Sequence, residues 1–149
     1  MEDLSNNKIA IVGLGYVGLP LATEFASVRK VVGYDIDSKR IEELKAGIDR
    51  TGAIGLGNLE TLTAITFTTD ITELLECNCY IVTVPTPIDE ARVPNLHPLL
   101  TATREVAGVL SPGDIVIYES TVFPGCTEEV CVPVLERVSG LVFNKDFFC

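Results

Sequence analysis

Three glycines and one acidic residue have the types and the spacing needed to hold a dinucleotide. Gly13, Gly15 and Gly18 form a G-x-G-x-x-G pattern directly after the short apolar run 8–12. In such a pattern the first glycine permits a tight turn, the second lets a pyrophosphate approach the backbone, and the third lets a helix pack against a strand. Asp35 lies 22 residues after Gly13, where a carboxylate can accept hydrogen bonds from the adenosine ribose hydroxyls.

The chain around these residues has the elements that must position them. The run 8–12 is apolar and branched, which is typical of a strand buried on both faces. A helical pattern follows to about Val28, and a second branched run ends at Asp35. This order favours dinucleotide binding over a structural turn that is merely rich in glycine. A second glycine repeat, at 52–57, has no apolar strand before it and predicts a loop.

Strands continue to alternate with helices further along the chain. Apolar runs predict strands at 64–69, 80–84 and 114–118, with helical patterns between and after them. This alternation predicts an α/β fold of the Rossmann type, a doubly wound, mostly parallel sheet with helices on both faces. Ligands of such sheets bind beyond the carboxyl ends of the strands. The expected ligand rim consists of the segments 13–18, Asp35, 84–87 and 119–121.

Apolar spacing predicts which side of each helix is buried. Val17, Leu21 and Phe25 recur every four residues and predict the sheet-facing stripe of the first helix. Ile48 extends the apolar face predicted for the second helix. In the last helical segment, Pro133 predicts a kink or a break, because proline lacks the backbone N–H that a helix interior needs.

Three further polar residues have an ordinary interpretation beside a functional one. Arg40 is either a solvated charge or a rim residue that lies over the adenine or pairs with a phosphate. It could also accept a 2′-phosphate, but Asp35 would repel that group, so NAD is expected rather than NADP. Thr121 is either an ordinary strand-end hydroxyl or a holder of a water or of the cofactor's amide. His97 precedes Pro98 at a helix start and is expected to be structural or exposed.

Composition limits the class of protein. The chain has 149 residues, 47% of them hydrophobic, which suits one domain with a buried core. Its net charge of −10 argues against nucleic acid and anionic membranes as partners, although backbone N–H groups can still hold phosphate. No apolar run approaches the roughly 20 residues of a membrane helix. The polar start 1–7 lacks the features of a signal peptide, so a cytoplasmic protein is expected.

The five cysteines predict neither a metal site nor a disulfide framework. Their number is odd, and their spacing suits neither zinc ligation nor paired bridges. Reduced thiols packed as small apolar groups are expected, and no activating neighbour marks a nucleophile. The sequence stops on the apolar run 147–149, which predicts the opening of a strand. A natural terminus is usually polar, so a shortened chain is expected.

Four segments together resemble one enzyme family. They are KIAIVGLGYVGLPLA at 8–22, VPTP at 84–87, YESTVFPG at 118–125 and TEEVCVPVLE at 127–136. In these segments the chain resembles the UDP-glucose/GDP-mannose dehydrogenases. It is most similar to the branch that acts on UDP-N-acetylhexosamines in polysaccharide biosynthesis, the Vi polysaccharide type. The resemblance covers 8–149 and is far more specific than the glycines alone.

The resemblance implies an oxidoreductase, a nucleotide-sugar 6-dehydrogenase with NAD as cofactor. Such an enzyme oxidises the C6 alcohol of a UDP-sugar, either a UDP-N-acetylhexosamine or UDP-glucose, to a uronate with two NAD. The resemblance also implies that Thr121 helps to order a catalytic water. The implied NAD contacts are Gly13, Leu14, Gly15, Tyr16, Val17, Gly18, Asp35, Arg40, Val84, Pro85, Thr86, Ser120 and Thr121.

The family's other catalytic groups lie in motifs that these 149 residues do not contain. Its glutamate follows an SPE-type motif and its nucleophilic cysteine a GGxCxPKD-like motif, so no catalytic residue is expected here beyond Thr121. Residues 1–149 are expected to be the NAD-binding domain, an N-terminal piece of a larger three-domain enzyme that is inactive by itself. The complete enzyme is expected to be a homo-oligomer through the family's central helix. The alternative is a regulatory dinucleotide-sensing module without chemistry; segment 118–125 favours the dehydrogenase.

Overall fold

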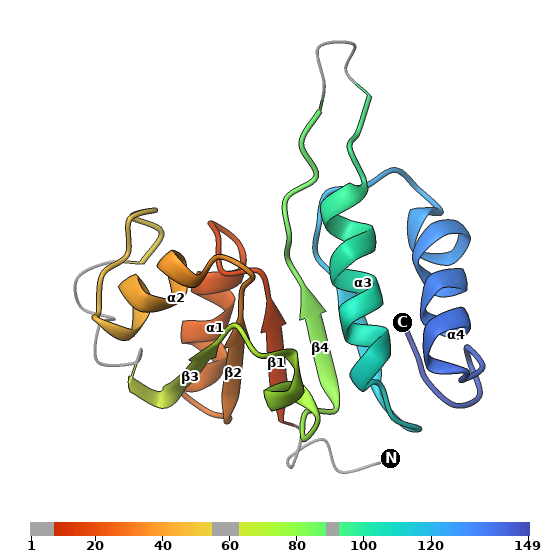
Figure 1. Ribbon diagram of the computed structural model, residues 1–149, viewed down its shortest axis with the longest axis horizontal. Helices are drawn as coiled ribbons and strands as arrows, with labels where there is room; N and C mark the ends of the chain where they lie inside the picture. Colours follow the sequence, from red (N-terminus) through yellow and green to blue (C-terminus); the bar gives the residue numbers. More distant parts are fainter. Residues whose placement is uncertain (1–7, 55–62, 89–92) are drawn as a thin grey trace.

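The computed structural model describes residues 8–54, 63–88 and 93–149. Within these ranges, five parallel strands form one sheet in the order β3-β2-β1-β4-β5 (Figure 1). The strands are β1 (Ile9–Val12), β2 (Val31–Tyr34), β3 (Ile65–Thr68), β4 (Cys79–Val82) and β5 (Ile115–Tyr118). The order reverses between β1 and β4, which is the switch point of a doubly wound sheet. The polar start 1–7 and part of the predicted loop at 52–57 lie outside the described residues.

Helices connect the strands. They are α1 (Gly18–Ala26), α2 (Ser38–Lys45), α3 (His97–Val109) and α4 (Val132–Ser139), with a short 3₁₀ helix, η3 (Ile71–Leu74), and a π-helical turn, η4 (Thr127–Cys131). Asp37 caps α2 by accepting the N–H groups of Lys39 and Arg40, and Asp70 caps η3 by accepting that of Thr72. These caps satisfy backbone donors that have no partner inside the helix.

The core lies on both faces of the sheet. On β1, Ile9 and Ile11 belong to the cluster that α1 and α2 cover, whereas Ala10 and Val12 belong to the cluster that α3 and α4 cover. All four residues are buried, as expected of a strand between two helical layers. Figure 1 shows α3 and α4 side by side, apart from α1 and α2. The predicted Rossmann-type α/β fold is confirmed.

The buried side of α1 differs from the predicted stripe. Val17 precedes the helix and is 48% exposed, and Leu21 and Phe25 only flank the core. The fully buried positions are instead Leu19 and Ala22. The glycine turn fixes how the helix starts against the sheet, and this rotates the buried side away from a simple four-residue pattern.

The two predictions near helix ends have different outcomes. The prediction that Ile48 belongs to the apolar face of α2 is wrong, because this residue is 56% exposed. The helix ends before Ile48, and Gly47 turns the chain with a φ of 74°. Of the kink or break predicted at Pro133, a break is absent from the described range 93–149, because the π-helical turn η4 continues directly into α4. In η4 the N–H of Val132 bonds to the carbonyl of Thr127, five residues earlier, and α4 follows. Proline crowds the carbonyl four residues before it, and the wider π turn relieves that crowding.

The last residues pair with the edge strand β5. The N–H of Val116 donates to the carbonyl of Phe148 over 2.8 Å, and the N–H of Phe148 donates to the carbonyl of Asp114 over 3.0 Å. Phe147 is fully buried in the core. The strand opening predicted at 147–149 is therefore present as an isolated parallel bridge to β5.

Candidate dinucleotide site

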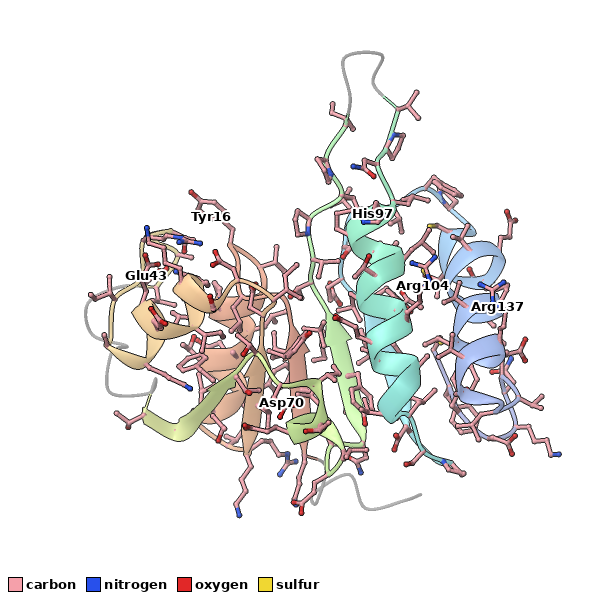
Figure 2. All side chains as sticks on the ribbon, in the orientation of Figure 1. Tyr16, Glu43, Asp70, His97, Arg104 and Arg137 are labelled. Atoms are coloured by element: carbon pink, nitrogen blue, oxygen red, sulfur yellow. The ribbon has the colours of Figure 1, made fainter. Side chains whose placement is uncertain are left out.

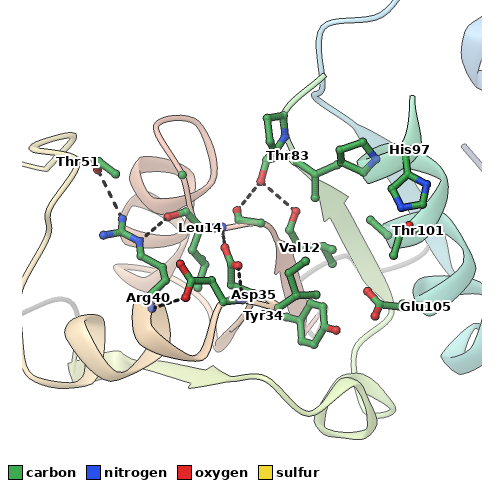
Figure 3. Close-up of a pocket in the computed structure, with 18 of the residues that line it drawn as sticks. Val12, Leu14, Tyr34, Asp35, Arg40, Thr51, Thr83, His97, Thr101 and Glu105 are labelled. Atoms are coloured by element: carbon green, nitrogen blue, oxygen red, sulfur yellow. Dashed lines mark hydrogen bonds between the residues drawn. The ribbon is translucent and has the colours of Figure 1, made fainter. Parts of the chain in front are cut away.

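The glycine turn joins the carboxyl end of β1 to α1 (Figure 3). Gly13 has a φ of 99°, which favours glycine, and its N–H donates to the carbonyl of Tyr34 over 2.8 Å. A Cβ on Gly18 would lie 1.8 Å from the carbonyl oxygen of Gly13 and 2.4 Å from Oγ1 of Thr83, so a side chain does not fit there. A Cβ on Gly15 would meet no atom within 4 Å. The turn is tightly packed at Gly18 and open at Gly15.

The start of α1 has no side-chain cap. Its N-cap residue, Val17, makes no side-chain hydrogen bond to the first turn. The first N–H groups of a helix have no intrahelical partners and carry partial positive charge. Next to an open glycine turn, such groups can bind an anion such as a phosphate.

Asp35 lies just past the end of β2, and its carboxylate is held against the glycine turn. Oδ2 accepts the N–H of Leu14 over 2.8 Å, and Oδ1 accepts the N–H of Asp37 over 2.9 Å. These bonds fix the carboxylate, while each oxygen keeps capacity for a further donor. The position suits the acceptance of hydrogen bonds from ribose hydroxyls.

Arg40 reaches the same end of the site from α2. Its side chain is only 3% exposed, which excludes the interpretation as a solvated charge. Nε donates to the carbonyl of Leu14 over 2.9 Å (Figure 3). Nη2 lies 2.9 Å from Oδ1 of Asp49. Nη1 is buried and makes no hydrogen bond within the part of the chain that the structure describes. A buried donor without a partner is unusual in a folded protein and indicates that a ligand can supply the acceptor.

Asp49 organises the segment that follows α2. Its side chain is 5% exposed and accepts the N–H groups of Thr51, Ala53 and Ile54 as well as the hydroxyl of Thr51. Burial alone would raise the pKa of Asp49, but the hydrogen bonds from Thr51, Arg40 and the backbone lower that pKa to about 2. The carboxylate is therefore charged at neutral pH, and the segment 49–54 folds around it.

Thr83, just after β4, is a site residue that the sequence pattern does not reveal. Its hydroxyl donates to the carbonyl of Gly13 over 2.7 Å and lies 3.2 Å from the carbonyl of Val12. The residue is buried against the position where a Cβ on Gly18 would lie. Thr83 thus ties the end of β4 to the glycine turn. The sequence signal is only a hydroxyl in an apolar run, which is common in strands.

The loops that follow β4 and β5 are joined to each other. Oγ of Ser120 donates to the carbonyl of Val84 over 2.6 Å, and Oγ1 of Thr86 donates to the carbonyl of Thr121 over 2.6 Å. Thr121 itself is exposed. The two later segments of the predicted rim therefore do lie together.

A cavity of about 480 Å³ lies beyond the carboxyl ends of β1, β2 and β4 (Figure 3), and its size is typical of a small-molecule site. The predicted contact residues that line it are Gly13, Leu14, Gly15, Asp35, Arg40, Val84 and Pro85. The predicted residues outside its lining are Tyr16, Val17, Gly18, Thr86, Ser120 and Thr121. Tyr16 is 74% exposed and points outward (Figure 2).

Helix α3 supplies a wall of the cavity that the sequence reasoning missed. Thr101, Ala102 and Glu105 line this wall together with His97 (Figure 3). Burial and then the neighbouring Glu105 carboxylate raise the pKa of Tyr34, which also lines the cavity. His97 is exposed, as expected, but lies at the cavity (Figures 2 and 3). The polar residues 97, 101 and 105 are spaced four apart, which indicates that they share one face of the helix.

The thiols do not form a reactive or metal-binding centre. Cys77, Cys79, Cys126 and Cys131 are buried, and burial raises the pKa of each of these thiols. The fifth, Cys149, is exposed, and all five are free. Over the described ranges, His, Cys, Asp and Glu side chains do not gather into a group that could hold a metal ion. Over the same ranges, each helix is too short or too polar to cross a membrane.

The match to a family model defines the class of protein. Residues 7–147 match the NAD binding domain of the UDP-glucose/GDP-mannose dehydrogenase family. The chain belongs to the UDP-glucose/GDP-mannose dehydrogenase family. The predicted family and the predicted cofactor, NAD, are both confirmed by this match.

Individual relatives narrow the comparison. The chain is 57% identical to a UDP-N-acetyl-D-glucosamine 6-dehydrogenase of Pseudomonas aeruginosa over 99% of this chain and 34% of that protein. It is 55% identical to a protein of the same name from Salmonella typhi, over 99% of this chain and 35% of that protein. The solved UDP-D-ManNAc dehydrogenase of Pyrococcus horikoshii matches with a TM-score of 0.86 and 39% identity, over 94% of this chain and 34% of that one. The chain therefore spans about a third of the length of these relatives.

Proposed function

We propose that residues 1–149 are the NAD-binding domain of a larger, three-domain NAD-dependent UDP-sugar 6-dehydrogenase. The proposed reaction converts the C6 alcohol of a UDP-sugar, a UDP-N-acetylhexosamine or UDP-glucose, into a uronate. This oxidation removes four electrons, so it needs two NAD, each of which accepts one hydride. Identities of 57% and 55% to two UDP-N-acetyl-D-glucosamine 6-dehydrogenases support the N-acetylhexosamine class.

The glycine turn is the observation that carries the proposal. Its backbone is open at Gly15 and leads into a helix start without a side-chain cap, which fits a pyrophosphate held by backbone N–H groups. We assign this role to the N–H groups of 15–18, including those of Tyr16 and Val17. The N–H groups of Gly13 and Leu14 already donate to the carbonyl of Tyr34 and to Asp35, so these two residues shape the turn instead. Gly13 contributes by its positive φ, and Gly18 by its close contact with the carbonyl of Gly13; both shape the turn.

The ribose end and the nicotinamide end are assigned to different strands. Asp35 would accept the adenosine ribose hydroxyls, and the unpartnered Nη1 of Arg40 would donate to the same part of the cofactor. The linked loops after β4 and β5 would hold the nicotinamide half through Val84, Pro85, Thr86, Ser120 and Thr121. In the complete enzyme, the exposed hydroxyl of Thr121 would help to order a catalytic water.

Isothermal titration calorimetry of the 149-residue chain with NAD tests the binding assignment. We expect saturable binding, and we expect no steady NADH production when a UDP-sugar is added, because the thiols described above are not activated. Absence of NAD binding by a folded chain would refute the assignment of the site. Continuous NADH production would refute the proposal that this domain is inactive by itself.

The substrate is tested on the complete protein with a panel of UDP- and GDP-sugars. We expect NADH to form with a UDP-N-acetylhexosamine or UDP-glucose and not with GDP-mannose. A dinucleotide-sensing module would bind NAD but reduce it with none of the sugars, so the assay separates the two functions. We further propose that the complete protein is cytoplasmic and forms a homo-oligomer. Size-exclusion chromatography with light scattering can check the oligomeric state.

A further inference from the structure

The charges at the ribose end of the cavity conflict with a simple preference for NAD. Asp35 is held by the N–H of Leu14, and Arg40 is held by the carbonyl of the same residue. The two charged groups therefore lie next to each other at one end of the cavity, which both of them line. An acid at this place favours the free ribose hydroxyls of NAD, whereas an arginine accommodates the 2′-phosphate of NADP.

Asp49 resolves this conflict. From the geometry we infer that Asp49 sets the preference for NAD, because its negative charge neutralises that of Arg40 at the ribose end of the cavity. The inference rests on the proposed cofactor site. Nη2 of Arg40 lies 2.9 Å from Oδ1 of Asp49, and the two side chains are 3% and 5% exposed. At such low exposure, solvent screens the pair far less than it would at the surface.

The other arginine that lines this end is also paired, but at the surface, where its side chain and that of Asp37 are each 44% exposed. Arg50 also lines the cavity, but it pairs with Asp37 and, over 3.3 Å, with Glu43. Each cationic side chain at the ribose end therefore has its own carboxylate, and Asp35 adds one further negative charge. A 2′-phosphate would meet a net negative surface there, although two arginines line the cavity.

Asp49 has a structural role that must be separated from its charge. It accepts the hydroxyl of Thr51 and three backbone N–H groups, so its removal also affects the segment 49–54. Asp49→Asn keeps the size of the side chain and an oxygen for Arg40. Thr51→Val removes the hydroxyl contact but leaves the charge of Asp49 unchanged. Glu42→Gln makes the same change in net charge on the exposed side of α2.

The test measures dissociation constants for NAD and for NADP with the 149-residue chain and these variants. We expect Asp49→Asn to shift the ratio of the two constants toward NADP by about tenfold or more, since an unpaired Arg40 would then face the 2′-phosphate. Thr51→Val and Glu42→Gln should leave the ratio within about threefold of the unsubstituted chain. An unchanged ratio in folded Asp49→Asn overturns the inference.

A second comparison keeps the inference testable if Asp49→Asn does not fold. Arg40→Gln and the double variant Arg40→Gln/Asp49→Asn differ only in the charge of residue 49, and the double variant buries no charge from this pair. The double variant should bind NADP, relative to NAD, about tenfold better than Arg40→Gln does, and equal ratios overturn the inference. If the unsubstituted chain binds neither cofactor, the proposed cofactor site fails instead.

Discussion

Leu14 is the residue on which the ribose end of the site depends. Its N–H binds Asp35 and its carbonyl binds Arg40, so one peptide segment sets the positions of an anion and a cation. Its side chain is fully buried in the core cluster on the face of the sheet that α1 and α2 cover. The apolar residue inside the glycine pattern is therefore an anchor as well as a spacer.

Replacement of Asp35 tests the ribose assignment. Asp35→Ala should weaken NAD binding by about 1.5–3 kcal/mol, the usual contribution of a hydrogen bond to a charged group. It should also reduce the discrimination against NADP, because a negative charge next to the 2′-phosphate is lost. Titration calorimetry with both cofactors measures the two effects. Asp35→Asn retains an acceptor for the N–H of Leu14 and serves as the control; equal affinities for all three proteins would contradict the assignment.

Gly15 and Gly18 differ in the space around them, so substitutions at the two positions should have opposite effects on stability and binding. Gly15→Val should leave the fold intact, since a Cβ there meets no atom within 4 Å, but should abolish NAD binding by occupying the space of the pyrophosphate. Gly18→Ala should destabilise the fold by roughly 1–3 kcal/mol, because its Cβ would lie 1.8 Å from the carbonyl oxygen of Gly13. Urea unfolding and NAD titration of both variants separate stability from binding. A Gly15→Val protein that is folded and binds NAD normally would disprove the phosphate assignment.

The sequence predicts those site residues whose type is fixed by the local backbone geometry. Gly13 and Gly18 could be predicted because a positive φ and a close backbone contact exclude other residues there. Thr83 and Asp49 could not, because their roles depend on partners that the fold brings to them. The hydroxyl of Thr83 binds a carbonyl 70 residues away, and no local pattern encodes that distance.

At the scale of elements, β4 is joined to the glycine turn by one buried side-chain bond. Thr83→Val keeps the shape of the side chain but removes the donor to the carbonyl of Gly13. We expect it to lower the free energy of unfolding by about 1–2 kcal/mol, because a buried carbonyl loses its partner. Thr66→Val makes the same chemical change at an exposed position of β3 and should change stability by less than about 0.5 kcal/mol. If urea unfolding showed the same change in free energy for Thr83→Val and Thr66→Val, the hydrogen bond of Thr83 would not stabilise the turn.

The strands could be predicted better than the helix faces. A strand buried on both sides shows itself as an apolar run, as 8–12 does, and β1 lies inside that run. Which side of α1 is buried depends instead on how the tightly packed Gly18 orients the start of the helix. For that reason Leu19 and Ala22 are the buried residues. Spacing alone carries no information about that starting angle.

At the scale of the whole molecule, Asp49 makes stability depend on acidity. Its pKa falls from 3.8 to about 2 on folding, so its ionised form stabilises the fold above about pH 4. This contribution is lost as the pH falls toward 2 and amounts to about 2 kcal/mol. Asp49→Asn should lack this part of the pH dependence, which urea unfolding at about pH 6 and about pH 2.5 can measure. Glu42→Gln is the control, and an acid-induced loss of equal size in all three proteins would contradict the prediction.

The bond between Thr83 and Gly13 also has a consequence for synthesis on the ribosome. The chain emerges from its N-terminus, so β1, α1, β2, α2 and β3 are exposed before β4 is made. Until β4 docks, one edge of β1 is unpaired and the glycine turn lacks the wall that Thr83 and Val84 give it. The nascent first half therefore has no complete cofactor site. NAD therefore cannot guide the folding of that half; it can bind only after β4 has docked against β1.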